Sequence, residues 1–210
     1  MFAIGIPTLN RADLLLPSLE KYVHDFPDVE IYVIDNGEQD IKNWVDWKGL
    51  PITVFEEKEN LGVAASWNKL CKHIYNTHEY ALIINDDVYL GYNTQTIKDV
   101  IKQNRLIVQS RYNFSVLLIN KELYHFVGEF DEMFYPAYYE DSDYLYRLKL
   151  LGIKHSVDER LNPINALISQ TYEKAPELVN NAMEKNRLRY IEKWGGSPLL
   201  EIFTEPYNNQ

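Results

Sequence analysis

The sequence predicts an α/β protein whose central sheet is mostly parallel and is flanked by helices. In the first half of the chain, short apolar runs alternate with segments of helical spacing, which is the pattern of parallel strands joined by helices. Two of the apolar runs stop at carboxylates, Asp35 and the pair Asp86-Asp87, because an unpaired charge inside a buried strand is very costly. In an open α/β sheet, ligands bind at this edge. The pattern therefore predicts both the architecture and the edge that carries the site.

The expected strands are short apolar runs bounded by turn residues. They comprise residues 2–6, 29–34, 51–55, 80–84, 106–109, 114–119 and 153–157. The runs at 106–109 and 114–119 are expected to form a small antiparallel element, whereas the strands of the first half are expected to be parallel. Pro7 is expected to end the first strand, because proline has no backbone N–H to donate.

The expected helices have apolar residues at helical spacing. They comprise residues 12–24, 63–75, 94–103, 140–151 and 176–194, with one or two further turns at 41–47. Gly152 is expected to cap the helix at 140–151, and Lys149 in its last turn complements the helix dipole. The residues after Trp194 are expected to fray, since a Gly-Gly-Ser-Pro segment breaks the last helix.

The composition limits the class of protein. A length of 210 residues suits one domain, expected to span 1–210, and 46% hydrophobic residues with 25% charged residues is typical of a globular protein. A net charge of −10 argues against a nucleic-acid or anionic-membrane surface, because both need clustered Lys and Arg. Cys71 is the only cysteine, so an intrachain disulfide is excluded and a reducing compartment is expected. With no signal peptide and no apolar run near ~20 residues, we expect a cytoplasmic protein with no transmembrane segment.

Several common catalytic motifs are missing from the sequence. It has no Gly-x-Gly-x-x-Gly after the first strand and no Gly-Lys-Ser/Thr phosphate loop, which argues against a dinucleotide dehydrogenase and a P-loop enzyme. It has no Gly-x-Ser-x-Gly elbow of a serine hydrolase, and its five histidines show no paired zinc spacing.

Acidic residues instead occur at three comparable positions. Asp35 and Asp86-Asp87 follow expected strands, and Glu140-Asp141 begins an expected helix. Alternate loops at the carboxyl edge of a parallel sheet share one crevice, and hard oxygen ligands suit Mg²⁺ or Mn²⁺ better than zinc. The alternative is that these residues are solvated turns and a helix cap.

Five segments together resemble GT-A glycosyltransferases, particularly the family-2-like ones with rhamnosyltransferase-like motifs. Ile84-Asn85-Asp86-Asp87-Val88 is similar to their Asp-x-Asp motif in an Asn-x-Asp form, and Tyr139-Glu140-Asp141 is similar to their Glu-Asp segment. The segments follow one another in the family's order and cover about residues 2–153, namely 6–11, 33–37, 60–68, 84–88 and 130–147. The resemblance implies a GT-A fold with a nucleotide-sugar-binding half at 1–105 and an acceptor half at 106–210.

The resemblance also implies roles on the donor side. Asp87 would be the ligand of Mn²⁺ or Mg²⁺, Asp86 would contact the ribose or the cation, and Asp35 would accept a hydrogen bond from the base. Further substrate or nucleotide contacts are implied for Thr8, Asn10, Arg11, Asn60, Gly62, Asn68 and Asn85. The alternatives are capping by Thr8 or Asn60 and a surface charge at Arg11.

On the acceptor side, Asp141 would be the general base of a single displacement with inversion, and Glu140 would contact substrate. A base works best when its pKa approaches the working pH, whereas a helix N-terminus favours the anion, so burial and neighbouring acids would have to offset the dipole. Three tyrosines form either an acceptor-side wall or helix packing, namely Tyr135, Tyr138 and Tyr139. The alternative for Asp141 is a helix cap.

The implied reaction transfers a sugar, with rhamnose and glucose as candidates, from a UDP- or dTDP-linked donor to a glycan or glycoprotein hydroxyl. This would occur in the cytoplasm of a bacterium, or of a host cell if the protein is viral. One departure concerns the metal: relatives often have a histidine near the last strand, whereas residues 166–172 have none and His155 lies earlier. The alternative functions are a catalytically silent sugar- or nucleotide-binding module and a nucleotidyltransferase, which should carry a Gly-rich activation loop after its first strand.

Overall fold

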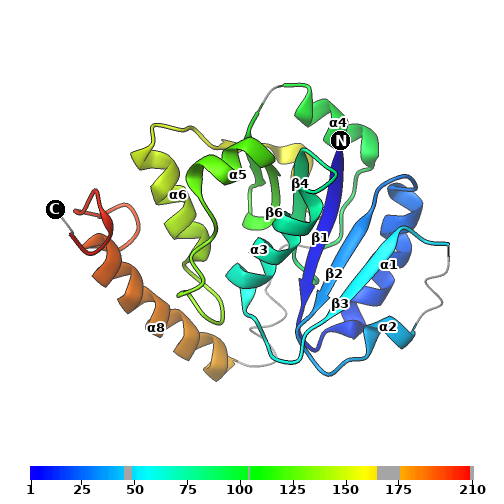
Figure 1. The fold of residues 1–210 in the computed structure, drawn as a ribbon, viewed down its shortest axis with the longest axis horizontal. Helices are drawn as coiled ribbons and strands as arrows, with labels where there is room; N and C mark the ends of the chain where they lie inside the picture. The colour runs from blue at the N-terminus through cyan, green and yellow to red at the C-terminus, as the bar shows by residue number, and fades with distance from the viewer. Residues whose placement is uncertain (45–48, 104, 165–175, 209–210) are drawn as a thin grey trace.

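Seven strands form one sheet in the order β3-β2-β1-β4-β6-β5-β7 (Figure 1). The computed structural model describes residues 1–44, 49–103, 105–164 and 176–208. The strands are β1 (Phe2–Thr8), β2 (Ile31–Asp35), β3 (Ile52–Glu56), β4 (Tyr80–Ile84), β5 (Ile107–Ser110), β6 (Asn113–Asn120) and β7 (Ser156–Val157). β1 pairs in parallel with β2 and β4, β2 with β3, and β5 with β7, whereas β6 is antiparallel to both β4 and β5. The predicted fold class, including the antiparallel element, is confirmed.

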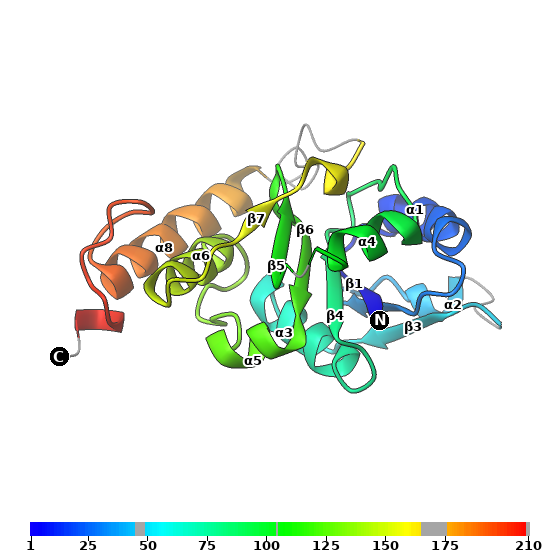
Figure 2. The same cartoon turned by 90° about the horizontal axis from the view of Figure 1, so that it is seen from above.

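Helices cover both faces of the sheet (Figure 2). They are α1 (Ala12–Asp25), α2 (Ile41–Trp44), α3 (Val63–Ile74), α4 (Thr94–Ile101), α5 (Lys121–Val127), α6 (Glu140–Leu150) and α8 (Pro176–Trp194), with the 3-10 turns η1 (Glu159–Leu161) and η2 (Pro206–Asn208). Helices α1 and α4 lie on one face and α3 and α5 on the other, while α6 and α8 run beside the β5 end of the sheet. None of the described helices is both long enough and apolar enough to span a bilayer.

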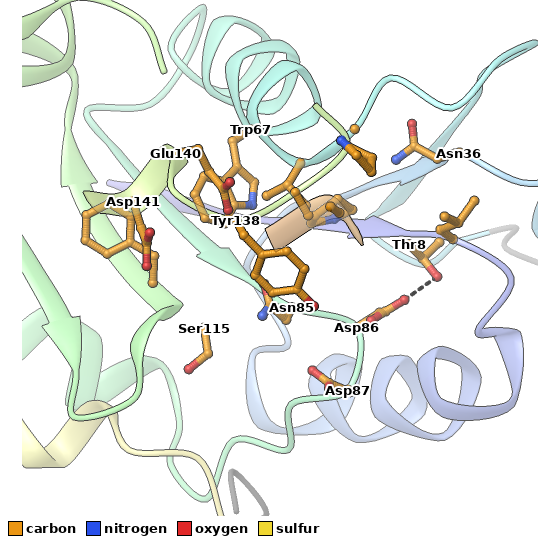
Figure 3. A pocket seen from close by; sticks show the side chains of 18 of the residues that line it. Thr8, Asn36, Trp67, Asn85, Asp86, Asp87, Ser115, Tyr138, Glu140 and Asp141 are labelled. Atoms are coloured by element: carbon orange, nitrogen blue, oxygen red, sulfur yellow. Dashed lines mark hydrogen bonds between the residues drawn. The ribbon is translucent and has the colours of Figure 1, made fainter. Parts of the chain in front are cut away.

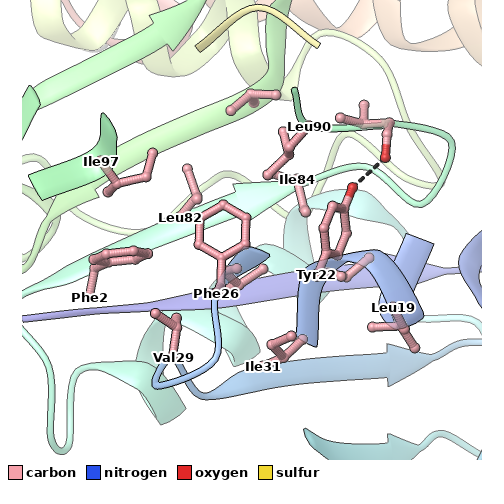
Figure 4. Close-up of a cluster of buried hydrophobic side chains, with 14 of the residues drawn as sticks. Phe2, Leu19, Tyr22, Phe26, Val29, Ile31, Leu82, Ile84, Leu90 and Ile97 are labelled. Atoms are coloured by element: carbon pink, nitrogen blue, oxygen red, sulfur yellow. Dashed lines mark hydrogen bonds between the residues drawn. The ribbon is translucent and has the colours of Figure 1, made fainter. Parts of the chain in front are cut away.

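Alternating residues of the central strands build the two sides of the core. On β4, Leu82 and Ile84 pack with α1 and α4 (Figure 4), whereas Ala81 and Ile83 pack with α3. All four are fully buried, and a buried Leu or Ile contributes roughly 1.5–3 kcal/mol. Tyr22 of α1 donates its hydroxyl hydrogen bond to the Val88 carbonyl, which ties the loop after β4 to the core. The end of β4 is therefore held rigidly.

Two expectations about β1 and α5 need correction. β1 does not end at Pro7 but continues to Thr8, because pairing with β4 stops at Gly5 and Pro7 is opposed only by Ile34 of β2. The missing backbone N–H of Pro7 therefore removes no hydrogen bond between β1 and β4. Helix α5 was not expected; the Asn120 side chain accepts hydrogen bonds from its first turn, and the helix stops at a glycine with φ 91°.

The expectation of a frayed C-terminus is also wrong for residues up to 208. The chain reverses at Gly195, where φ is 74°, and the amides of Ile202 and Phe203 both donate to the Trp194 carbonyl at 3.0 Å. Tyr146 of α6 then donates to the Phe203 carbonyl at 2.8 Å. These bonds fold the terminal segment back against α6 and α8.

Candidate active site

A cavity of about 510 Å³ opens at the carboxyl edge of the sheet. Its walls come from the ends of β1 and β4, the loop before α3, the start of β6, and the segment that leads into α6. Figure 3 shows Asp86 and Asp87 on one side of the cavity and Glu140 and Asp141 on the other, with Tyr138 between them in the view. The elements of both halves of the chain therefore converge on one space.

Eight of the predicted site residues line this cavity, and four do not. Those that line it are Thr8, Asn60, Gly62, Asn85, Asp86, Asp87, Glu140 and Asp141. Those outside it are Asn10, Arg11, Asp35 and Asn68.

Asp86 is held in the cavity wall by a neighbouring strand. Thr8 Oγ1 donates to Asp86 Oδ2 at 2.7 Å, so Thr8 joins the end of β1 to the end of β4 (Figure 3). Burial raises the pKa of Asp86 to about 6, the Thr8 hydrogen bond lowers it, and the charge of Asp87 raises it. Two adjacent carboxylates in a partly desolvated wall favour a nearby cation.

The lining residues suit a hard divalent cation. Among the described residues, the cavity has four carboxylates, Asp86, Asp87, Glu140 and Asp141, and neither lysine nor arginine. A diphosphate bound here needs a positive partner, and Mg²⁺-type sites use one or two carboxylates together with substrate phosphates. In the part of the chain that the structure describes, no three His, Cys, Asp or Glu side chains converge into a ready-made metal cage.

The β2 end presents Asn36 to the cavity rather than Asp35. Asp35 is buried, and its Oδ1 accepts from Gly37 N at 3.0 Å and from Gln39 Nε2 at 2.8 Å, which stabilises the turn. Asn36 donates to Ser66 Oγ at 2.9 Å and accepts from Leu61 N at 3.0 Å. It thereby fixes the loop before α3.

The loop before α3 is shaped for close contact. Asn60 Oδ1 accepts from Gly62 N at 2.9 Å, so Asn60 both stabilises the turn and lines the cavity. Gly62 has φ 78°, and a Cβ there would lie 2.8 Å from the Pro136 carbonyl. Val63 N donates to that carbonyl at 2.8 Å. Glycine is therefore required where the loop before α6 meets α3.

Three other predicted residues lie outside the cavity lining. Arg11 precedes α1, is buried, and donates from Nε to Asp13 Oδ1 at 3.0 Å; its charge lowers the pKa of Asp86. Asn10 has φ 55°, a left-handed conformation that asparagine tolerates. Asn68 donates to the Phe130 carbonyl and to Glu132 at 2.9 Å and accepts from Phe130 N at 2.8 Å. It therefore holds the segment before α6 against α3.

Asp141 lies in the first turn of α6 and faces the cavity. Burial raises its pKa above the ordinary value, although Ser142 opposes this by donating its backbone N–H to Asp141 Oδ1 at 2.6 Å. Desolvation therefore outweighs the local hydrogen bonds in setting the pKa of Asp141. Burial, followed by the charge of Asp141, raises the pKa of Glu140 well above its ordinary value.

Of the three tyrosines before α6, only Tyr138 lines the cavity. Tyr138 and Tyr139 both have φ 75°, an uncommon conformation for bulky residues. Tyr139 turns away and packs on Tyr190 at 5.6 Å between ring centroids, and Tyr135 is 43% exposed. The expected acceptor-side wall of three tyrosines is thus reduced to Tyr138, and Tyr139 instead packs against helix α8.

The sequence did not reveal several lining residues. Tyr112, Asn113, Phe114 and Ser115 line the cavity because β6 runs antiparallel and so begins at the edge where the parallel strands end. Trp67 lines it from α3, but its spacing in a helix looks like that of a core residue. Residues 166–172, which contain no histidine, lie outside the described residues, and His155 is exposed.

Comparison with solved structures gives the class of the fold. The chain resembles the mannosyltransferase PcManGT from Pyrobaculum calidifontis, solved with GDP-Man and Mn²⁺, at TM-score 0.68 and 17% identity over 94% of this chain and 66% of that one. It resembles GalNAc-T7, solved with UDP, GalNAc and Mn²⁺, at TM-score 0.67 and 12% identity over 92% of this chain and 48% of that one. It resembles S. aureus TarS at TM-score 0.60 and 17% identity over 90% of this chain and 39% of that one. The fold is that of the GT-A glycosyltransferases.

The sequence comparison agrees with this class. The model of glycosyl transferase family 2 matches residues 3–144, and the chain belongs to that family. The match includes the ends of β1, β2 and β4 and the first turn of α6. No curated protein matches the chain in sequence. The chain spans less than two thirds of the length of PcManGT, GalNAc-T7 and TarS.

Proposed function

We propose that this chain is an inverting glycosyltransferase, which moves a sugar from a nucleotide-diphosphate donor to a hydroxyl of a glycan or glycoprotein. The observation that carries the proposal is that Asp86 and Asp87 line one side of the same cavity that Asp141 lines on the other. Family membership supports the same activity. A nucleotidyltransferase fits less well, because the loop after β1, Leu9-Asn10-Arg11, contains no glycine.

Asp87, beside Asp86, is the proposed protein ligand of Mn²⁺ or Mg²⁺. When bound there, the cation would neutralise the donor diphosphate and improve it as a leaving group. Thr8, Asn36 and Asn60 line the adjoining part of the cavity and are the proposed nucleotide contacts. UDP and dTDP are the proposed nucleotides, with rhamnose or glucose as candidate sugars.

Asp141 is the proposed general base. It would take the proton of the acceptor hydroxyl while the hydroxyl oxygen attacks the anomeric carbon from the face opposite the diphosphate. The new carbon–oxygen bond forms as the bond from the anomeric carbon to the diphosphate oxygen breaks, so the configuration inverts. The raised pKa of Asp141, caused by burial, suits a carboxylate that must accept a proton near neutral pH.

A thermal-shift panel tests the proposal directly. UDP, dTDP and GDP sugars are added with and without Mn²⁺, and a ligand at ~100 times its Kd should stabilise the protein by about 2.7 kcal/mol, a shift of a few degrees in Tm. We expect a shift with at least one nucleotide sugar and a larger shift when Mn²⁺ is present. If no nucleotide sugar shifts the Tm under either condition, the silent module becomes the better description.

A further inference from the structure

Two buried polar atoms in the cavity wall have no hydrogen-bond partner among the described residues. They are the indole Nε1 of Trp67 and the carboxyl Oε2 of Glu140. Trp67 is 3% exposed and Glu140 is 6% exposed, and both line the cavity. In Figure 3 the two side chains enter the cavity from α3 and from the start of α6. Two separate elements thus each direct an unpaired polar atom into one space.

Such atoms are costly unless a ligand pairs with them. Leaving a buried donor or acceptor unsatisfied costs about 1–3 kcal/mol, and native proteins pair the great majority of such groups. The ring of Trp67 is otherwise well packed, with its centroid 5.1 Å from that of Phe130 and 6.1 Å from that of Phe114. The indole is therefore fixed by its ring, and its N–H remains available to a ligand.

The chemistry of the two atoms selects the ligand. An indole N–H can only donate, whereas a neutral carboxyl group can both donate and accept. A cation would be repelled by the indole N–H, and a phosphate would be disfavoured beside Glu140 and Asp141. A hydroxyl group fits both partners, since it accepts from Trp67 and donates to or accepts from Glu140. The ring of Tyr138, which lines the same cavity, offers an apolar face to the C–H groups of a sugar ring.

We propose that Trp67 and Glu140 together bind one hydroxyl of a pyranose and so contribute to the choice of sugar. This inference rests on the proposed function and extends it to a specificity-determining pair that includes Trp67. The pyranose can be the transferred sugar of the donor or the first sugar of the acceptor. Both present the same hydroxyl chemistry, and the two arms of the experiment below distinguish them.

The first arm measures binding of UDP, UDP-glucose, dTDP, dTDP-glucose, GDP and GDP-mannose with Mn²⁺ by calorimetry. Trp67→Phe keeps an aromatic ring and removes the N–H, and Glu140→Leu removes the polar atoms at similar size. For a donor hydroxyl, each variant should weaken nucleotide-sugar binding about tenfold and leave the free nucleotide unchanged. Glu140→Gln should restore most of the affinity.

Trp194→Phe is the control. The indole N–H of Trp194 donates to Asp143 at 2.8 Å, so this variant should lower Tm without changing the ratio of nucleotide-sugar affinity to free-nucleotide affinity.

The second arm measures binding of methyl α-D-glucopyranoside, methyl α-D-mannopyranoside and methyl α-L-rhamnopyranoside by saturation-transfer NMR, with and without UDP and Mn²⁺. For an acceptor hydroxyl, wild type should bind a glycoside, and both Trp67→Phe and Glu140→Leu should weaken it while nucleotide-sugar affinity stays constant. If wild type binds glycosides but no nucleotide, the proposed transferase function fails and the hydroxyl site stands. If neither variant changes the affinity of any sugar-containing ligand, or wild type binds none, the hydroxyl site is disproved.

Discussion

Asp141 and Asp143 lie two residues apart on α6 and have opposite environments. Asp143 is fully buried and accepts hydrogen bonds from Lys193 Nζ at 2.6 Å, Arg147 Nε at 2.9 Å and Trp194 Nε1 at 2.8 Å. Asp141 lines the cavity, and among the described residues its side chain accepts hydrogen bonds from its neighbour Ser142. One carboxylate is neutralised by the fold, and the other is left for a ligand.

The cluster around Asp143 holds the fold together, whereas Asp141 is the proposed reacting group. Lys193 also donates to Asp131 at 2.7 Å, so one ammonium group links α8, α6 and the segment before α6. A buried ion pair with complete hydrogen bonding is costly to disrupt, because the remaining charge is left in low dielectric. The paired cluster therefore anchors the helix whose first turn presents the unpaired Asp141. Substitutions in the paired cluster and in the cavity should therefore have different effects on stability and on activity.

The largest effect is expected from Asp141→Asn. Removing a general base typically lowers kcat by 10²- to 10⁴-fold, and we expect about 10³-fold here, because the amide cannot take the acceptor proton. Donor affinity should be unchanged, which calorimetry with the nucleotide sugar from the thermal-shift panel would check. Asp99→Asn changes a half-exposed carboxylate on α4 that does not line the cavity; it is the control and should retain full activity. Full activity in Asp141→Asn would remove Asp141 from the role of base.

Lys193→Met should destabilise the fold by about 3 kcal/mol, since it leaves Asp143 and Asp131 with less compensation in a buried position. Urea denaturation would measure the loss. Lys149→Met is the matched control, because this lysine is 63% exposed and lies 3.5 Å from Glu201, so the change should stay within about 0.5 kcal/mol. Equal stabilities of the two variants would contradict the anchoring role of Lys193.

A nucleotide sugar should stabilise the wild-type protein, and part of this effect should depend on Mn²⁺. Asp87→Ala should abolish that part, which is up to about 2.7 kcal/mol when the nucleotide sugar is at 100 times its wild-type Kd. The reason is that the proposed cation has few protein ligands and relies on this carboxylate. The thermal shift with and without Mn²⁺ measures the effect, again with an Asp99 variant as the control. An undiminished Mn²⁺ effect would show that the metal binds elsewhere or that Asp87 is dispensable.

The same contrast explains which parts of the molecule could be predicted from the sequence. The end of β4 was predictable, because an unpaired charge cannot continue a buried strand, whereas β2 runs one residue beyond the expected end and includes Asp35, whose buried carboxylate accepts hydrogen bonds from Gly37 and Gln39. The approach of Asp141 to Asp86 and Asp87 followed from the family resemblance, and all three residues line the cavity. The contribution of Ser115 was not predictable, since it depends on β6 running antiparallel beside β4. Local spacing records which residues are apolar but does not give the order of strands.

The pairing around Asp143 was only partly predictable. The Asp143–Arg147 pair has the i, i+4 spacing that the sequence shows, and it lies in a largely buried site rather than on the surface. Lys193 comes from 50 residues further along the chain, so its contact depends on how α8 packs on α6. The roles of Trp67 and Asn68 were not predictable from spacing either. They are adjacent on one helix, yet Trp67 lines the cavity and Asn68 binds the loop that contains Phe130.

The smallest effect expected is a gain in stability from Asp141→Asn. Burial raises the pKa of Asp141, so its charged form disfavours the folded state above that pKa, and protonation removes the penalty as the pH falls. The variant should be more stable than wild type at pH 7, and the difference should vanish as the pH falls toward about 4, where the carboxyl is protonated in both states. Urea denaturation between pH 4 and pH 8 measures it. Lys193→Met should show the opposite sign at pH 7, and a loss of stability in both variants would mean that Asp141, like Asp143, holds the fold together.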